Sequence, residues 1–202
     1  MSWDLNLAYK TLQKDPVMKA VIKKTGKLDH VKNTNLYFSL LQSITSQQLS
    51  TKAGDTIFGR FLDLFPERKP IPEKVIKINV EKLRAAGLSY AKAGYIKNIA
   101  EFSITHGLDY RKLNKMEDDQ LMEYLTSIKG VGRWTAEMIL MFTVNRPDIL
   151  PVDDIGIRNE MKKIYGINGE GKKLIEQMHV TSEPWKPFRT LACRHLWRHR
   201  DQ

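Results

Sequence analysis

The sequence predicts an all-α protein built from two helical lobes. Apolar residues recur at helical spacing along most of the chain, and start and stop signals for helices divide it into segments of ordinary length. No stretch shows the strict apolar–polar alternation of a half-buried strand. With 202 residues, of which 42% are hydrophobic, the chain is long enough to bury a core.

The first clear helix signal lies at Asp15. Aspartate caps a first turn, Pro16 fits the first helical position, and Gly26 follows the last turn. The later segments show apolar faces at helical spacing or similar terminal signals. They cover residues 35–50, 51–65, 71–78, 79–87, 89–107, 116–128, 154–166, 171–180 and 186–200. Helices that follow one another in this way bury their apolar faces against each other, which predicts the all-α class.

The division into lobes is predicted from the same pass along the chain. We expect a central lobe of residues 36–146, and a second lobe that combines residues 1–35 with residues 147–202. No repeat at a solenoid period and no low-complexity linker interrupts the chain. Both termini would therefore belong to the same lobe.

Charge and cysteine content narrow the function classes. A net charge of +10 favours an anionic partner, either nucleic acid, an acidic membrane or an acidic protein, although a merely soluble basic protein would share it. Cys193 is the single cysteine, which excludes an internal disulfide and multi-cysteine zinc or iron–sulfur sites and suits a reducing compartment. The N-terminus lacks the apolar core of a signal peptide, and the longest apolar-rich run, residues 136–144, is too short to cross a bilayer. We expect a soluble intracellular protein.

A helix–hairpin–helix motif is predicted around residues 126–133. One helix ends near Ile128, a second begins near Arg133, and we expect the turn to be too tight for a Cβ at either Gly130 or Gly132. Unpaired N–H groups at such a turn accept a phosphate. The alternative is a plain corner between two helices. The expected phosphate contacts are Lys129, Gly130, Gly132 and Arg133, and the backbone carbonyls expected to hold Na+ or K+ are those of Thr126, Ile128 and Val131.

Two adjacent aspartates open the segment that follows the hairpin helix. Pro151 ends any preceding helix, and Asp153 and Asp154 precede a segment with helical periodicity. One carboxylate can cap the helix while the other points into a cleft. The helix dipole favours the carboxylate anion, and such a group suits stabilising a developing cation or orienting a water molecule.

These motifs together resemble the helix–hairpin–helix DNA glycosylases, and most closely the DNA-3-methyladenine glycosylase II group. The resemblance rests on "IKGVGRWTA", "PVDDIGIR" and "WKPFRTLACRHLW", and on the middle segments "SITSQQLSTKAG" and "GLSYAKAGYIKNIA". It implies an active-site cleft between the two lobes and excision of a damaged base that is flipped out of the duplex. The chain is expected to lack the β-rich N-terminal domain and the iron–sulfur loop that some members carry.

The resemblance also implies roles for single residues. With Ile157 in register, the catalytic aspartate is Asp154, and Asp153 is a cap or a supporting neighbour; a slip of one residue would exchange them. Members that also cut the backbone carry a lysine close to the place of Trp134, directly before Thr135. Because tryptophan forms no Schiff base, we expect a monofunctional enzyme that uses water and leaves an abasic site.

The base pocket and the wedge are assigned by the same resemblance. Trp134, Met138 and Ile155 are expected to line the pocket, where Trp134 offers a π face to a cationic base or else packs in the core. Since relatives often have aromatic side chains at the other two positions, the base preference stays open. Gln48, with Gln47 beside it, is the expected wedge in the gap left by the flipped base, or else belongs to an ordinary polar helix end.

The C-terminal segment is rich in basic and aromatic residues. His195 and His199 have the spacing of a shared metal site, but no nearby acidic or cysteine ligand completes it, so a solvated basic helix face is expected. Trp185 and Trp197 are expected in the core.

We therefore predict a monofunctional glycosylase of base excision repair that hydrolyses the N-glycosidic bond of alkylated purines such as 3-methyladenine. The alternatives are a non-catalytic DNA-binding hairpin module and a glycosylase for oxidised or deaminated bases. We expect no required cofactor, double-stranded DNA with damaged bases as the partner, no membrane, and a monomer. The location would be cytoplasmic, with the nucleoid, in a bacterium, and nuclear in a eukaryote.

Overall fold

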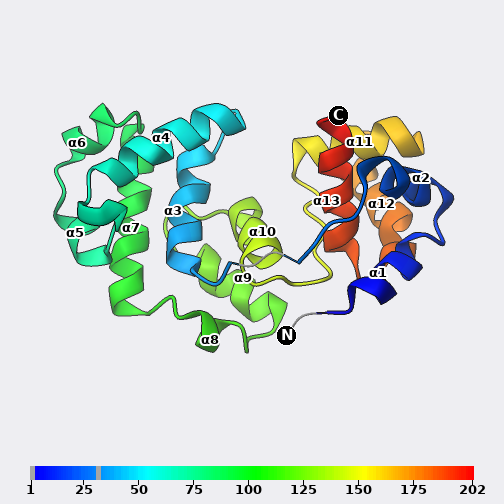
Figure 1. The fold of residues 1–202 in the computed structure, drawn as a ribbon, viewed down its shortest axis with the longest axis horizontal. Helices are drawn as coiled ribbons and strands as arrows, with labels where there is room; N and C mark the ends of the chain where they lie inside the picture. Colours follow the sequence, from blue (N-terminus) through cyan, green and yellow to red (C-terminus); the bar gives the residue numbers. More distant parts are fainter. Residues whose placement is uncertain (1–2, 31–32) are drawn as a thin grey trace. The chain divides into compact units, whose positions relative to one another are not determined.

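The computed structural model describes residues 3–30 and 33–202, whose regular elements are all helical (Figure 1). Because no strand occurs in these two ranges, the predicted all-α class is confirmed. The chain forms two compact units. The central unit is residues 33–139, and the terminal unit combines residues 1–32 with residues 140–202.

The central unit is organised around one long helix, α7 (Tyr90–Thr105), which contacts α3, α5 and α6. The inward face of α7 is buried because Ala93, Ile96 and Ile99 recur at helical spacing. The other elements of this unit are α3 (Leu36–Ser46), α4 (Thr51–Asp63), η1 (Pro66–Arg68), α5 (Pro72–Lys77), α6 (Val80–Ala85), α8 (Tyr110–Leu113) and α9 (Asp118–Thr126). The helix α10 (Arg133–Phe142) begins in this unit, and the division between the units falls within it.

The terminal unit is organised around the last helix, α13 (Arg189–Arg200), which contacts α2 and α11. Leu191, Ala192 and Leu196 of α13 are fully buried. The other elements of this unit are α1 (Leu5–Leu12), α2 (Pro16–Thr25), α11 (Ile155–Tyr165), α12 (Gly171–Ser182) and η2 (Glu183–Trp185). Chain segments from both termini therefore share one core.

One carboxylate joins three elements of the terminal unit, α2, α11 and η2. Asp15 caps α2 by accepting the N–H groups of Val17 and Met18, as its sequence position predicts. Its second oxygen accepts the Tyr165 hydroxyl at 2.8 Å and the Trp185 indole N–H at 2.9 Å. Trp185 is fully buried, which confirms its predicted core position. Burial, followed by the bond and the charge of Asp15, raises the pKa of Tyr165, so the phenol stays neutral and donates.

Two short helices were not predicted. The helix α1 has eight residues; it buries Ala8 and Leu12, which stand four residues apart on one face, and Asp4 caps its start. The helix α8 is a single turn of four residues after Asp109. Such short elements are stabilised by the unit they pack on more than by their own sequence.

No helix in the described ranges is both long enough and apolar enough to cross a membrane.

Candidate active site and DNA-binding hairpin

The predicted hairpin is present: α9 ends at Thr126 and α10 begins at Arg133. Gly130 has φ +103°, and a Cβ there would lie 2.2 Å from Cγ of Tyr95. Only glycine fits this position, because a side chain would be strained by the backbone angle and would also overlap the ring. The close contact with Tyr95 fixes the turn against α7.

The prediction that Gly132 also excludes a Cβ is wrong. Its φ is not in the left-handed region, and nothing lies within 4 Å of a Cβ built there. Gly132 is exposed, together with Lys129 and Arg133, while Gly130 is half-buried. The missing side chain leaves open space beside the first turn of α10, where N–H groups lack helical partners. A phosphate can approach such a backbone closely.

The expected cation ligands of the hairpin are backbone carbonyls. The carbonyl of Ile128 accepts the N–H of Val131 at 2.9 Å, and this bond closes the turn. A carbonyl oxygen has a second lone pair, so this bond leaves room for an ion contact. Within the described residues, no cluster of three or more His, Cys, Asp or Glu side chains could hold a metal.

Asp154 is the N-cap of α11, with extended backbone angles of φ −73° and ψ 119°. Its Oδ1 accepts the N–H of Ile157 at 2.8 Å and the indole N–H of Trp197 at 3.0 Å. The side chain is half-buried, so the carboxylate is held in a fixed direction by two donors while part of it stays accessible. A fixed carboxylate of this kind is suited to electrostatic stabilisation of a cation.

Of the two roles expected for Asp153, cap or supporting neighbour, the cap is wrong, since the cap is Asp154. Asp153 is exposed, and its Oδ1 accepts the Nη2 of Arg158 at 2.7 Å. The reason is backbone direction: only the carboxylate at position 154 reaches the free N–H three residues on. Asp153 supports the segment through Arg158, whose Nε also donates to the carbonyl of Val152.

Trp197 is only half-buried, which differs from the expected core position. The centroids of its ring and of the Phe142 ring are 5.6 Å apart, and its N–H is the second donor to Asp154. An indole N–H that is partly buried requires a hydrogen-bond acceptor. The presence of a tryptophan at position 197 is therefore the only sequence signal for this bond. The sequence could not say which acceptor, because 43 positions separate the two residues.

The expected pocket residues lie on two helices. Trp134 and Met138 are half-buried and stand four residues apart on α10, so they share one face of that helix. Ile155 is the first residue of α11, directly after Asp154, and is 72% exposed. An exposed isoleucine beside a fixed carboxylate is available for contact with a ligand rather than for the core.

The expected wedge residues lie in a turn after α3. This turn, residues 47–49, is called the wedge turn below. Gln47 ends α3, and its amide donates to the Thr135 hydroxyl at 2.8 Å. Gln48 is exposed with φ +58°, an uncommon angle for a residue with a side chain. Leu49, which sequence reasoning did not select, is 40% exposed.

The two histidines of α13 have separate partners. Nδ1 of His195, which is fully buried, lies 2.7 Å from the Thr25 hydroxyl, while Nδ1 of His199 lies 2.6 Å from Oε1 of Glu160. Burial, followed by the charges of Arg194 and Arg198, lowers the pKa of His195 to about 4. His195 therefore belongs to the core and not to an exposed basic face.

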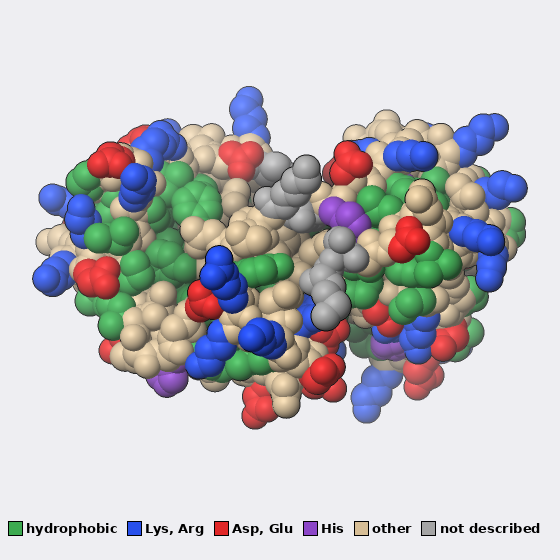
Figure 2. Space-filling model, turned by 60° about the horizontal axis from the view of Figure 1, so that its bottom comes forward, with side chains coloured by type: hydrophobic (Ala, Val, Ile, Leu, Met, Phe, Trp, Pro, Cys, Tyr) green, Lys and Arg blue, Asp and Glu red, His purple; other side chains and the backbone are tan. Residues whose placement is uncertain are grey.

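The surface carries its positive charge over a wide area. Figure 2 shows lysine and arginine side chains on both units, with carboxylates among them. A net charge of +10 distributed in this way suits a long anionic partner such as a DNA backbone.

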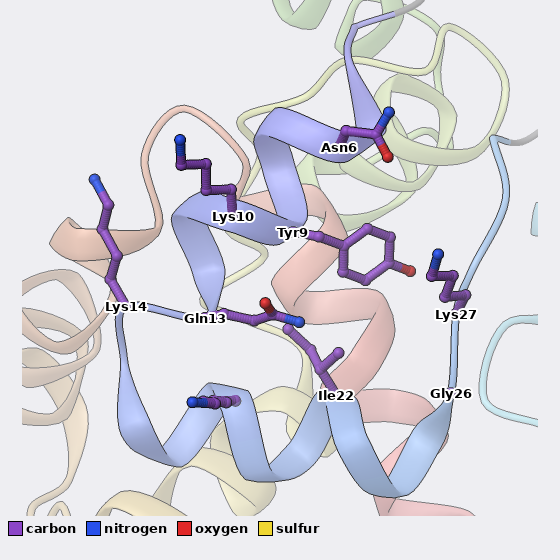
Figure 3. Close-up of a pocket in the computed structure, with 9 residues that line it drawn as sticks. Asn6, Tyr9, Lys10, Gln13, Lys14, Ile22, Gly26 and Lys27 are labelled. Carbon is purple, nitrogen blue, oxygen red and sulfur yellow. The ribbon is translucent and has the colours of Figure 1, made fainter.

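A basic hollow of ≈ 590 Å³ lies between α1 and α2 (Figure 3). Four lysines line it, namely Lys10, Lys14, Lys19 and Lys27, and no carboxylate is among its described lining residues. Asp154 is not part of that lining, so the hollow is separate from the aspartate site.

Hairpin, capped aspartate and basic surface on an all-α fold define a helix–hairpin–helix protein that acts on DNA. Residues 41–187 match the model of the HhH-GPD superfamily base excision DNA repair proteins. The match covers more than half of the chain, and the protein belongs to this family.

Known relatives agree with this assignment. The chain is 37% identical over 164 residues to DNA-3-methyladenine glycosylase 1 of Schizosaccharomyces pombe, covering 80% of this chain and 71% of the relative. A solved 3-methyladenine DNA glycosylase of that yeast, in complex with abasic DNA, superposes with a TM-score of 0.85 and 34% identity over 94% of each chain. The crystal structure of a DNA-3-methyladenine glycosidase from Bacillus halodurans superposes with a TM-score of 0.80 and 35% identity, covering 99% of this chain and 91% of that one.

Proposed function

We propose that this protein is a monofunctional DNA glycosylase that removes alkylated purines such as 3-methyladenine from double-stranded DNA. The observation that carries the proposal is the Asp154 carboxylate, which the N–H groups of Ile157 and Trp197 hold in a fixed direction. A module that only binds DNA has no need for a carboxylate near negatively charged phosphates. Family membership and the activities for which the relatives are named support the same function.

The chemistry requires little more than a placed negative charge. An N-alkylated purine is cationic, so its glycosidic bond is weak and the base is a good leaving group. As that bond breaks, positive charge develops on the sugar, and Asp154 stabilises this oxocarbenium character electrostatically. Water then bonds to the anomeric carbon and loses a proton, with the carboxylate placed to orient it. The products are a free base and an abasic site.

The hairpin binds the DNA backbone. We assign the contact with one phosphate region to the backbone at Gly132 and the side chains of Lys129 and Arg133, and the exposure of these residues supports the assignment. We include in this proposal a Na+ or K+ ion held by the carbonyls of Thr126, Ile128 and Val131, which would add charge beside the phosphate.

The proposal includes no cutting of the DNA backbone. Trp134 directly precedes Thr135 on α10, where a lyase would carry an amine, and an indole nitrogen forms no Schiff base. Trp134 offers instead a ring face on which a cationic base can stack. Abasic product should therefore stay uncut until alkali is added.

The test is incubation with methylated genomic DNA, followed by mass spectrometry of the released bases. We expect 3-methyladenine among the products of the native protein and none above background with Asp154→Asn. Binding of the DNA without release of any base would contradict the proposal and favour the binding module. Release from oxidised or deaminated DNA alone would favour the other alternative.

A further inference from the structure

The wedge turn has a conformation that needs support from outside its own sequence. Gln48 adopts φ +58°, which costs free energy for a residue with a Cβ. Helix α3 stops at Ser46, and Gln47 turns away at φ −50° and ψ 132°. The last carbonyl groups of a helix have no helical partner, so this end must be satisfied by other groups.

Lys92 of α7 supplies hydrogen-bond donors to this end of α3. Its ammonium donates to the carbonyl of Thr45 at 2.8 Å and to that of Gln47 at 2.7 Å. The two carbonyls lie on either side of the end of α3, so one side chain bridges the last helical turn and the first residue of the wedge turn. Charged donors make the stronger class of hydrogen bond, and a cation also suits a helix C-terminus. Lys92 is half-buried, and this burial lowers the pKa of its ammonium.

Two further contacts hold the wedge turn and the end of α3 before it. The Gln47 amide reaches the Thr135 hydroxyl on α10, next to Trp134 in the chain. On the other side, Gly54 of α4 packs so closely that a Cβ there would lie 2.8 Å from the Ser46 hydroxyl oxygen. The wedge turn is thus anchored to α7 and α10, and the end of α3 before it packs against α4, while Gln48 and Leu49 at the tip stay exposed.

We propose that Lys92 is a positioning residue for base flipping, which holds the wedge turn so that Gln48 and Leu49 can fill the space left by the flipped nucleotide. This inference rests on the proposed function. A turn that must enter a base stack loses less entropy if its shape is fixed beforehand. The two anchored carbonyls and the strained Gln48 are the observations that carry it.

The competing role for Lys92 is direct contact with a DNA phosphate. Two of its three N–H donors already bond to carbonyls inside the protein, and the side chain is half-buried. A phosphate contact would make the salt dependence of DNA binding steeper, while a positioning role leaves it unchanged. The two roles are therefore separable by experiment.

The experiment compares Lys92→Met with Lys97→Met. Both lysines lie on α7 and are half-buried, but Lys97 donates only to the carbonyl of Ile76, away from the wedge turn. Flipping is followed by the fluorescence of 2-aminopurine placed beside the lesion, and excision by single-turnover kinetics. We expect Lys92→Met to slow both by about 10- to 100-fold, from the loss of two charge-assisted bonds, and Lys97→Met to change neither.

Three controls separate positioning from loss of the fold. Affinity for undamaged DNA and its salt slope should match those of the native protein, whereas a lost phosphate contact would lower the slope by about 0.9. A lesion placed opposite an abasic site is already unpaired, so the defect of Lys92→Met should shrink on that duplex. Combined with Gln48→Ala, which alters only an exposed side chain, Lys92→Met should cost less than the sum of the single effects.

Native-like flipping by Lys92→Met would overturn the inference while leaving the proposed function intact, provided that the native protein excises. A defect of the same size on paired and unpaired lesions would also overturn it. Lys92→Arg retains the charge and the donors, so it should recover part of the activity; if it behaves like methionine while melting at the native temperature, the bonds to the carbonyls are not the cause.

Discussion

Asp154 combines a structural and a proposed chemical role in one side chain. The same oxygen that caps α11 also accepts the indole N–H of Trp197. Asparagine is as good a cap as aspartate, because its side-chain oxygen accepts the same backbone N–H. Charge and capping can therefore be separated at this position by a single substitution.

Asp154→Asn should abolish base excision, with a loss of at least about 100-fold, because the developing cation loses its counter-charge. DNA affinity should stay the same or rise, since a negative charge near phosphates is removed. Single-turnover excision and fluorescence anisotropy measure the two effects. The matched control is Asp153→Asn, which removes only an exposed ion pair with Arg158 and should excise at nearly the native rate. If Asp153→Asn lost excision and Asp154→Asn retained it, Asp153 would be the catalytic residue.

Trp197→Phe tests the second donor to the carboxylate. The change keeps an aromatic ring against Phe142 but removes the N–H that bonds to Asp154. We expect excision to slow by about 10-fold, from the loss of one bond to a charged group. The affinity for DNA that contains an abasic site should change little. An unaltered excision rate would show that capping alone holds the carboxylate.

At the scale of elements, the hairpin shows that two glycines in one turn serve different purposes. Gly130 is required by its φ of +103° and by the ring of Tyr95, whereas Gly132 has free space around it. The first glycine makes the turn possible, and the second keeps its backbone open to a partner. The sequence pattern of glycine, valine and glycine does not distinguish these purposes.

Gly130→Ala should lower the free energy of unfolding by roughly 2 kcal/mol, because a Cβ is strained at that φ and overlaps Tyr95. Gly132→Ala should cost less than about 1 kcal/mol but weaken DNA binding, because its methyl group would stand where a phosphate approaches. Urea unfolding measures the stability of the two variants, and binding titrations measure their affinity for DNA. Equal losses of stability in the two variants would contradict the claim that only Gly130 is required by the turn.

At the scale of the whole molecule, buried polar groups join distant parts of the chain within the terminal unit. His195 of α13 bonds to Thr25 at the end of α2, across 170 positions. The Thr25 hydroxyl donates to the carbonyl of Val21, so Nδ1 of His195 donates to that hydroxyl. Burial of the ring lowers the pKa of His195 and keeps it neutral. The nearby charges of Arg194 and Arg198 also oppose protonation.

Acid should therefore destabilise the fold in a defined range. The pKa of His195 is about 4 in the folded protein and near the ordinary 6.5 when unfolded, so below 6.5 the unfolded chain takes up a proton that the folded chain does not. Stability is full above this value and is lost as the pH falls toward about 4, by about 2 kcal/mol between pH 7 and roughly pH 5. Urea unfolding at the two pH values tests this. His195→Leu should show a smaller loss over the same range; an equal loss would assign the effect to other groups.

The sequence by itself determined the helical class, most of the helices and the family. These features depend on periodicity, on caps such as Asp15 and on breakers such as Gly26, all of which act between neighbours in the chain. The hairpin was predictable for the same reason. The helices α1 and α8 were not predicted, because they are short: α1 has eight residues and α8 has four, and such elements depend on the unit on which they pack.

Only the tertiary structure decided which side chains meet. It made Asp154 rather than Asp153 the cap, gave that carboxylate a donor on α13, and brought Lys92 to the end of α3. Each of these contacts joins residues more than 40 positions apart or depends on one backbone angle. Local sequence patterns fix where a helix begins and ends, but the direction of a side chain and its distant partner follow from how the helices pack.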